Sequence, residues 1–232
     1  MNKIDRRVSY KIMLDTETCN TRCVDGQMDM RDVLVYDIGW AVVDKRGKIY
    51  EEKSYIVKEI FMGERDLMKS AYYANKIPQY LMDIEKGTRK VATMYEIRKD
   101  LLETMNRYNA HTVVAHNSRF DLNALNATYR WLTKSKHRFF FPYGTEVWDT
   151  MKMANDTICK QPTYKRFCER NGYVTKNGQV RKTAEILYRY IACQPNFVEC
   201  HTGLEDVRIE AIILAKCFAQ HKKMRKKLYE NA

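Results

Sequence analysis

The sequence predicts an α/β domain whose mixed sheet joins an antiparallel hairpin to parallel strands. Short apolar runs, rich in β-branched and aromatic residues, alternate with longer segments of helical periodicity, and this alternation is typical of a sheet packed against helices. The expected strands are residues 8–14, 33–43, 48–57, 111–115 and 146–148. The turn at residues 44–47 ends in glycine, so the second and third strands form the hairpin.

The remaining elements follow from helix periodicity and turn residues. Residues 16–31 are polar and too irregular for an element of their own, and Asn177-Gly178 predicts a small two-residue hairpin turn. Pro78 is expected to interrupt the helical segment 64–85, and Asp149 is placed to cap a short helix. The expected helices are residues 64–85, 93–108, 119–132, 150–153, 183–193 and 204–221.

Composition limits the partners of the chain. Its 41 basic and 29 acidic residues give a formal net charge of +12, which favours nucleic acid first and an anionic membrane surface second. The seven cysteines show no CxxC pair, so free thiols in a reducing cytoplasm are expected. No apolar stretch is long enough to cross a bilayer, and the amino terminus lacks the features of a signal peptide. We expect one domain, residues 1–221, followed by a basic tail, residues 222–232.

Two acidic residues follow the first strand directly. Asp15 and Glu17 are separated by one residue, and side chains two apart on an extended chain point to the same side. Paired carboxylates repel unless a cation neutralises them, and with phosphate oxygens they suit Mg²⁺ or Mn²⁺. A solvated acidic loop would show the same pattern, but the end of a strand is where α/β sheets place their sites.

Three further candidates lie at the starts of helices. Asp121 follows the strand at residues 111–115, and His201 precedes Asp206 by five residues where an apolar helix begins. Each acid alone is explained by the preference of a helix start for negative charge. The ordered set of acids and histidine favours a catalytic centre.

This set resembles the DEDDh family of 3′→5′ exonucleases, which includes ribonuclease T and the proofreading subunits of bacterial replicative polymerases. Residues 14–18, 115–121 and 201–206 are similar to the family's first, second and third motifs. Residues 148–151 are similar to its Asp-Thr segment, in which we interpret Asp149 as structural. The resemblance implies a ribonuclease H-like fold: a five-stranded mixed sheet with an antiparallel hairpin and helices on both faces.

The resemblance also implies a metal-dependent 3′→5′ exonuclease acting on single-stranded DNA or RNA. Asp15, Glu17, Asp121 and Asp206 would hold two Mg²⁺ or Mn²⁺ ions roughly 4 Å apart, and His201 would be the general base. Thr16 and Glu17 would meet the terminal 3′-hydroxyl, and the resemblance allows a homodimer.

Other substrate contacts are expected from the second motif. Asn117 and Phe120 are candidates because single strands are held by polar contacts and stacking, although Phe120 suits a core position equally well. Tyr72-Tyr73 is expected to be a packed helix face, with base stacking as the alternative.

Two departures from the family concern substrate rather than chemistry. Cys19-Asn20 replaces the usual small residue and glycine, and residues 21–32 form an insertion. Two other functions stay open: a nucleic-acid-binding module that no longer cuts, and a metal-dependent phosphodiesterase of small nucleotides. The intact set of five residues argues against the first.

Overall fold

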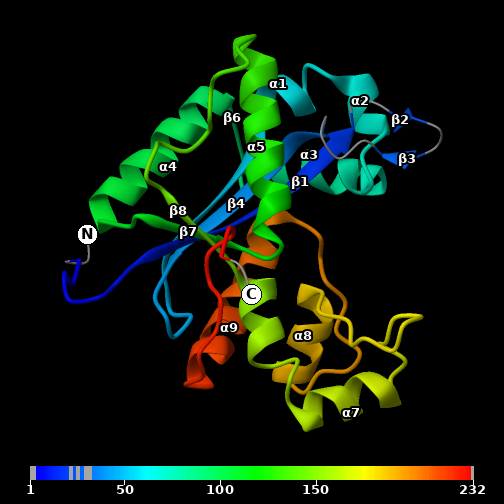
Figure 1. Ribbon diagram of the computed structural model, residues 1–232. Helices are drawn as coiled ribbons and strands as arrows, with labels where there is room; N and C mark the ends of the chain where they lie inside the picture. Colours follow the sequence, from blue (N-terminus) through cyan, green and yellow to red (C-terminus); the bar gives the residue numbers. More distant parts are fainter. Residues whose placement is uncertain (1–3, 21–22, 25–26, 29–32, 231–232) are drawn as a thin grey trace.

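The computed structural model describes residues 4–20, 23–24, 27–28 and 33–230. Within these residues a single mixed sheet has six strands in the order β6-β5-β4-β1-β7-β8 (Figure 1). The strands are β1 (Lys11–Asn20), β4 (Val33–Val43), β5 (Ile49–Val57), β6 (Lys90–Ala92), β7 (Thr112–Ala115) and β8 (Glu146–Asp149). The neighbours β1–β4 and β4–β5 are antiparallel, whereas β5–β6, β1–β7 and β7–β8 are parallel. The expected mixed α/β sheet is confirmed, but its five strands are wrong because β6 adds a sixth.

The first strand is longer than its apolar run. β1 starts at Lys11 and continues through the polar residues to Asn20, pairing with β4 along its whole length. A register shift between Glu17 and Thr18 interrupts this pairing, as a β-bulge does. The expectation of a strand ending at Asp15 is therefore wrong, because the partner strand β4 satisfies the backbone of the polar continuation. Part of the insertion, β2 (Cys23–Val24) and β3 (Gln27–Met28), pairs as a separate two-stranded ribbon; its other residues lie outside the described ones.

Helices cover both faces of the sheet, as expected from the resemblance (Figure 1). α4 (Met94–Tyr108) and α5 (Ser118–Thr133) pack on one face, and α6 (Thr150–Asp156), α8 (Ala184–Ile191) and α9 (Gly203–Ala219) on the other. Alternation along β1 separates the two cores: Ile12 and Leu14 belong to the first and Met13 to the second. β4 is buried on both sides, which places it at the centre of the domain.

Residues 64–85, expected to form one interrupted helix, form several shorter elements, and another short helix precedes them. α1 (Lys58–Phe61) and α2 (Arg65–Lys69) precede a 3₁₀ turn, η1 (Ala74–Lys76), and α3 (Ile77–Glu85) follows. Pro78 stands in the first turn of α3, so it begins a helix instead of interrupting one. Tyr72 and Tyr73 lie between α2 and η1, outside both. The expected packed helix face is therefore wrong at this pair.

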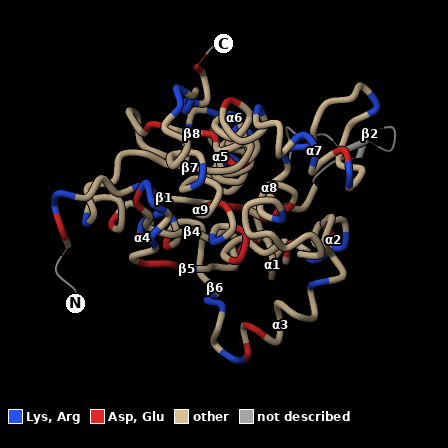
Figure 2. Tube along the Cα trace, turned by 90° about the horizontal axis from the view of Figure 1, so that it is seen from below, with Lys and Arg blue, Asp and Glu red and all other residues tan. Residues whose placement is uncertain are grey.

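The carboxyl-terminal half adds α7 (Pro162–Arg170) and a tail that packs on β8. Arg225 pairs with Asp156 at 2.8 Å, and the Leu228 amide donates to the Val147 carbonyl at 2.9 Å. The turn at Asn177-Gly178 brings Val174 and Val180 into a β-bridge, as expected. In the view of Figure 2, Lys and Arg are distributed over the whole trace and are not gathered on one side. No helix in the described part of the chain is long and apolar enough to cross a membrane.

Candidate active site

A pocket of about 430 Å³ opens where β1, α5 and the start of α9 meet. All five residues of the expected centre line it: Asp15, Glu17, Asp121, His201 and Asp206. The expected substrate contacts Thr16, Asn117 and Phe120 line it as well. The fold thus brings residues of the first strand of the chain, β1, together with residues at the start of its last helix, α9.

The strand β1 presents the first two acids. Asp15 and Glu17 pair with Gly39 and Asp37 of β4, and both side chains are half-buried. Thr16 lies between them, and its hydroxyl donates to Oδ1 of Asp121 at 2.8 Å. That bond fixes the first turn of α5 against β1, so the second motif is tied to the first.

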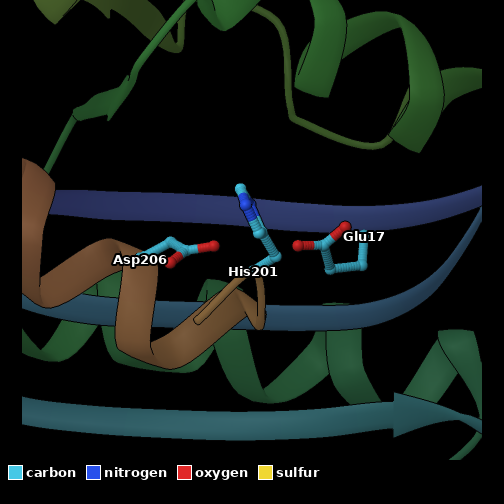
Figure 3. Close-up of side chains that lie close together, drawn as sticks. All are labelled: Glu17, His201 and Asp206. Atoms are coloured by element: carbon cyan, nitrogen blue, oxygen red, sulfur yellow. The ribbon is translucent and has the colours of Figure 1, made fainter. Parts of the chain in front are cut away.

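The start of α9 carries the other two residues. Asp206 is 5% exposed and lies in the first turn of the helix, while His201 precedes the helix with φ +49°. One ligand atom from each of Glu17, His201 and Asp206 lies within 4.8 Å of the others. Figure 3 shows the carboxylates of Glu17 and Asp206 pointing toward each other across His201.

Two glycines allow α9 to approach the sheet this closely. A Cβ on Gly39 of β4 would lie 2.3 Å from the Gly203 carbonyl carbon and from the Leu204 nitrogen. A Cβ on Gly203 would lie 2.7 Å from the Gly39 nitrogen. Backbone therefore packs on backbone at this crossing, and only glycine leaves room for it.

A buried ionic network holds the same helix start. The Gly203 amide and the Tyr80 hydroxyl donate to Oδ2 of Asp37 at 3.1 and 2.8 Å. Arg89, itself 6% exposed, pairs with Asp37 at 3.3 Å and with Glu205 at 3.1 Å. Because Asp37 is fully buried on β4, this network fixes the first turn of α9, and with it Asp206, relative to the strand that carries Glu17.

Burial raises the pKa of every acid in the pocket, and the charge of a neighbouring acid adds to each shift. Burial is the larger cause; it raises the pKa of Glu17 to about 9, of Asp206 to about 8 and of Asp121 to about 7. The pKa of Asp15 also lies well above its usual range, through burial and then through the charge of Asp121. Such a cluster ionises together only when cations neutralise it.

The donor set fits divalent metal. Carboxylate oxygens are the ligands preferred by Mg²⁺ and Mn²⁺, and the pocket supplies four of the expected carboxylates. Oδ1 of Asp206 is buried and has no hydrogen-bond partner among the described residues. An orphaned acceptor of this kind is costly unless a cation fills its coordination.

His201 is held by its neighbours as an uncharged ring. Tyr73 stacks on it with centroids 4.4 Å apart and planes 15° apart. Burial, and then the charge of Lys76, lower its pKa below the ordinary histidine value, with Glu185 opposing the shift. Lys76 donates to the carbonyls of Cys200 and His201, which supports the left-handed turn before α9.

The other histidine of the second motif is engaged on both ring nitrogens. Nδ1 of His116 lies 2.9 Å from the Thr150 hydroxyl, and Nε2 lies 2.8 Å from the Lys182 carbonyl oxygen. Since a carbonyl only accepts, Nε2 carries the proton and Nδ1 accepts from Thr150. His116 therefore has no free lone pair for a substrate. Asp149 caps α6 through the amides of Met151 and Lys152, which confirms its structural interpretation.

Sequence reasoning missed several residues that line the pocket. Glu199 lies 3.8 Å from Nδ1 of His201, and Glu210 lies one helical turn beyond Asp206. The four-residue spacing from Asp206 could have indicated Glu210, because residues four apart share one face of a helix. From the sequence we expected Tyr73 to pack on a helix face, and no local pattern indicates that it stacks on His201.

Solved structures share this architecture at low sequence identity. A full-length 3′-exonuclease matches with a TM-score of 0.57 at 13% identity, over 94% of this chain and 85% of that one. The nuclease domain of 3′hExo, a DEDDh family member bound to rAMP, matches with a TM-score of 0.55 at 13% identity, over 95% and 98%. The chain has the fold of a DEDDh-type 3′–5′ exonuclease.

A larger bacterial enzyme contains the same fold as a part. Exonuclease I of E. coli, in complex with a 5cy-dT13 oligonucleotide, matches with a TM-score of 0.53 at 11% identity. The match covers 93% of this chain but 41% of that enzyme. No protein-family model and no curated protein sequence matches the chain.

Proposed function

We propose that this chain is a metal-dependent exonuclease that hydrolyses phosphodiester bonds from the 3′ end of single-stranded nucleic acid. One observation carries the proposal: four acids and a histidine, expected from three separate motifs, line one pocket in a fold shared with 3′-exonucleases. The formal charge of +12 favours a polyanionic substrate, since it attracts phosphates over long range.

Asp15, Glu17, Asp121 and Asp206 would hold the divalent ions. The charges of Asp121, Glu210, Glu17 and Asp206 all raise the pKa of Asp15, so cations bound in this pocket would relieve a repulsion that Asp15 shares with the other acids. Bound ions would supply positive charge to the attacking and leaving oxygens of an in-line displacement.

His201 acts as the general base in this mechanism. Its neutral imidazole accepts a proton from the attacking water, whose oxygen forms a new bond to the terminal phosphorus. The bond from that phosphorus to the 3′-oxygen of the preceding nucleotide breaks, and that oxygen takes up a proton from solvent to become the new terminal 3′-hydroxyl. A 5′-mononucleotide leaves. The lowered pKa keeps the ring uncharged at neutral pH, and Tyr73 fixes its plane.

The pocket also has groups suited to a terminal nucleotide. Thr16, Glu17, Asn117 and Phe120 all line it. Thr16 and Glu17 would contact the terminal 3′-hydroxyl. Tyr72 borders it with a ring that is 74% exposed, which suits stacking on a base. The terminal base must leave its partner to enter, and unpairing costs a few kcal/mol, so single-stranded ends are the preferred substrate.

The two other functions make different demands on the chain. A binding module that no longer cuts has no use for a neutral histidine beside clustered acids. A phosphodiesterase of small nucleotides would cut dinucleotides as fast as long strands. The solved neighbours hold rAMP in one case and a deoxyoligonucleotide in another, so RNA and DNA are both candidate substrates.

The test is digestion of 5′-labelled single strands, both DNA and RNA, with Mg²⁺ or Mn²⁺. The proposal expects a ladder of products shortened one nucleotide at a time, no cutting in EDTA, and slower cutting of a blunt duplex. Asp15→Asn should abolish the ladder. A wild-type protein that binds strands without shortening them would support the binding module instead, and equal rates on dinucleotides and long strands would support the phosphodiesterase.

A further inference from the structure

Glu210 is an acid of the pocket that the five expected residues do not include. It lies on α9 four residues after Asp206, so both side chains occupy the same face of the helix. It is 2% exposed and lines the pocket together with Asp15 and Asp121. Its carboxylate is therefore shielded from bulk solvent and directed into the site.

The described surroundings of Glu210 offer one donor to its carboxylate, the backbone amide of His116, and leave its second oxygen unexplained. Its Oε2 is buried without a hydrogen-bond partner in the part of the chain that the structure describes. The charged groups that act on it most strongly are acids, with Asp121 first and Asp206 second. A buried structural carboxyl would pair with a cation or donate its proton to an acceptor, and Glu210 does neither through this oxygen.

Its position favours one side of the pocket. One side-chain atom from each of Glu17, His201 and Asp206 lies within 4.8 Å of the others, and Glu210 does not belong to that group. Glu210 lies one turn further along α9, where it lines the same pocket as Asp15 and Asp121. Oδ1 of Asp121 already accepts from the Thr16 hydroxyl. An ion on that side would otherwise depend on Asp15 and on the remaining coordination of Asp121.

We propose that Glu210 is a fifth carboxylate ligand of the metal centre, for the ion on the side of Asp15 and Asp121. This inference rests on the proposed metal-dependent function. A fifth carboxylate supplies the oxygen donor that the second ion otherwise lacks, so the chain binds both ions before nucleic acid arrives.

The test is titration of the metal-free chain with Mn²⁺ in the absence of nucleic acid, monitored by calorimetry and by the electron paramagnetic resonance of free Mn²⁺. The wild-type chain should bind two ions. Glu210→Gln keeps the shape of the side chain and should lower the affinity for one of the two ions by about tenfold or more. Loss of a metal-site residue commonly has an effect of this size. Asp149→Asn is the matched control, since it neutralises a buried acid that acts on Asp121 from outside the pocket lining and keeps an oxygen that can cap α6. It should change both affinities by less than about threefold.

Two results would overturn the inference while leaving the proposed function intact: unchanged binding of two ions by Glu210→Gln, or equal weakening by both variants, which would indicate a general field effect. A wild-type chain that binds no Mn²⁺ would overturn the proposed function and the inference together. If circular dichroism shows that Glu210→Gln does not fold, Glu210→Asp replaces it. This variant keeps the charge, withdraws the carboxylate by one methylene and should lower the affinity for the same ion. Wild-type affinity in Glu210→Asp would then contradict ligation.

Discussion

The crossing of α9 over β4 makes Gly39→Ala a sharp test of how the site is positioned. The new Cβ would lie 2.3 Å from two backbone atoms of α9, whereas ordinary contacts begin at 3.4 Å. Since neither backbone is a flexible side chain, the start of α9 must move by about 1 Å. Overpacking of this kind costs roughly 1–3 kcal/mol of stability.

The same displacement moves His201 and Asp206 relative to Glu17. A misplacement of about 1 Å in a catalytic group costs roughly 10²-fold in rate, so Gly39→Ala should fold but cut single strands about a hundred times more slowly. The assay is the initial rate of shortening of a 5′-labelled single strand at saturating Mn²⁺, with thermal unfolding measured on the same preparation.

Gly178→Ala is the matched control. Gly178 has φ +72°, and a Cβ there would meet no described atom within 4 Å, so the substitution costs roughly 1–2 kcal/mol through backbone strain alone. Both variants should lose comparable stability, but only Gly39→Ala should lose activity. Wild-type rates in Gly39→Ala, or equal rate losses in both variants, would show that this contact does not position His201 and Asp206.

Three further outcomes follow from the pocket. His201→Ala should slow the chemical step by about 10²–10⁴-fold with Mn²⁺ affinity nearly unchanged in calorimetry; a rate close to wild type would remove His201 as the base. Tyr73→Leu should slow cutting by about 2- to 10-fold, from the roughly 0.5–1.5 kcal/mol of an aromatic pair, whereas Tyr73→Phe should keep the wild-type rate. In EDTA the melting temperature should fall as the pH rises from about 4 to about 9. The reason is that Glu17 and Asp206, with pKa values raised to about 9 and about 8, keep their protons in the folded chain at pH values where the unfolded chain has lost them. Saturating Mn²⁺ should reduce this dependence on pH, and a melting temperature that rises with pH in EDTA would contradict the raised pKa values.

Most of the sheet could be predicted because its strands are apolar and bounded by turns. β6 could not, since its three residues show no alternation and pair only with β5 among the described strands. The polar half of β1 was missed for a related reason: its pairing with β4, and not its own hydrophobicity, makes it a strand. Pro78 misled because the same residue that breaks a helix interior also favours a helix start.

The candidate site divides in the same way. Asp15, Glu17, Asp121, His201 and Asp206 could be predicted because they stand in compact motifs at element ends. The stacking of Tyr73 on His201 depends on how a separate segment folds over the pocket, so the local sequence does not indicate it. The burial of the Arg89–Asp37 pair also depends on contacts distant in sequence.

The acids of this pocket are proposed to direct metal-dependent cutting from a free 3′ end. The most direct measurement compares one single strand in linear and circular form, incubated with the chain and Mn²⁺, with EDTA and Asp206→Asn as parallel reactions. We predict that the linear strand is degraded to mononucleotides, that the circle stays intact, and that both parallel reactions are inactive. Cutting of the circle, or degradation of the linear strand in EDTA, would contradict this function.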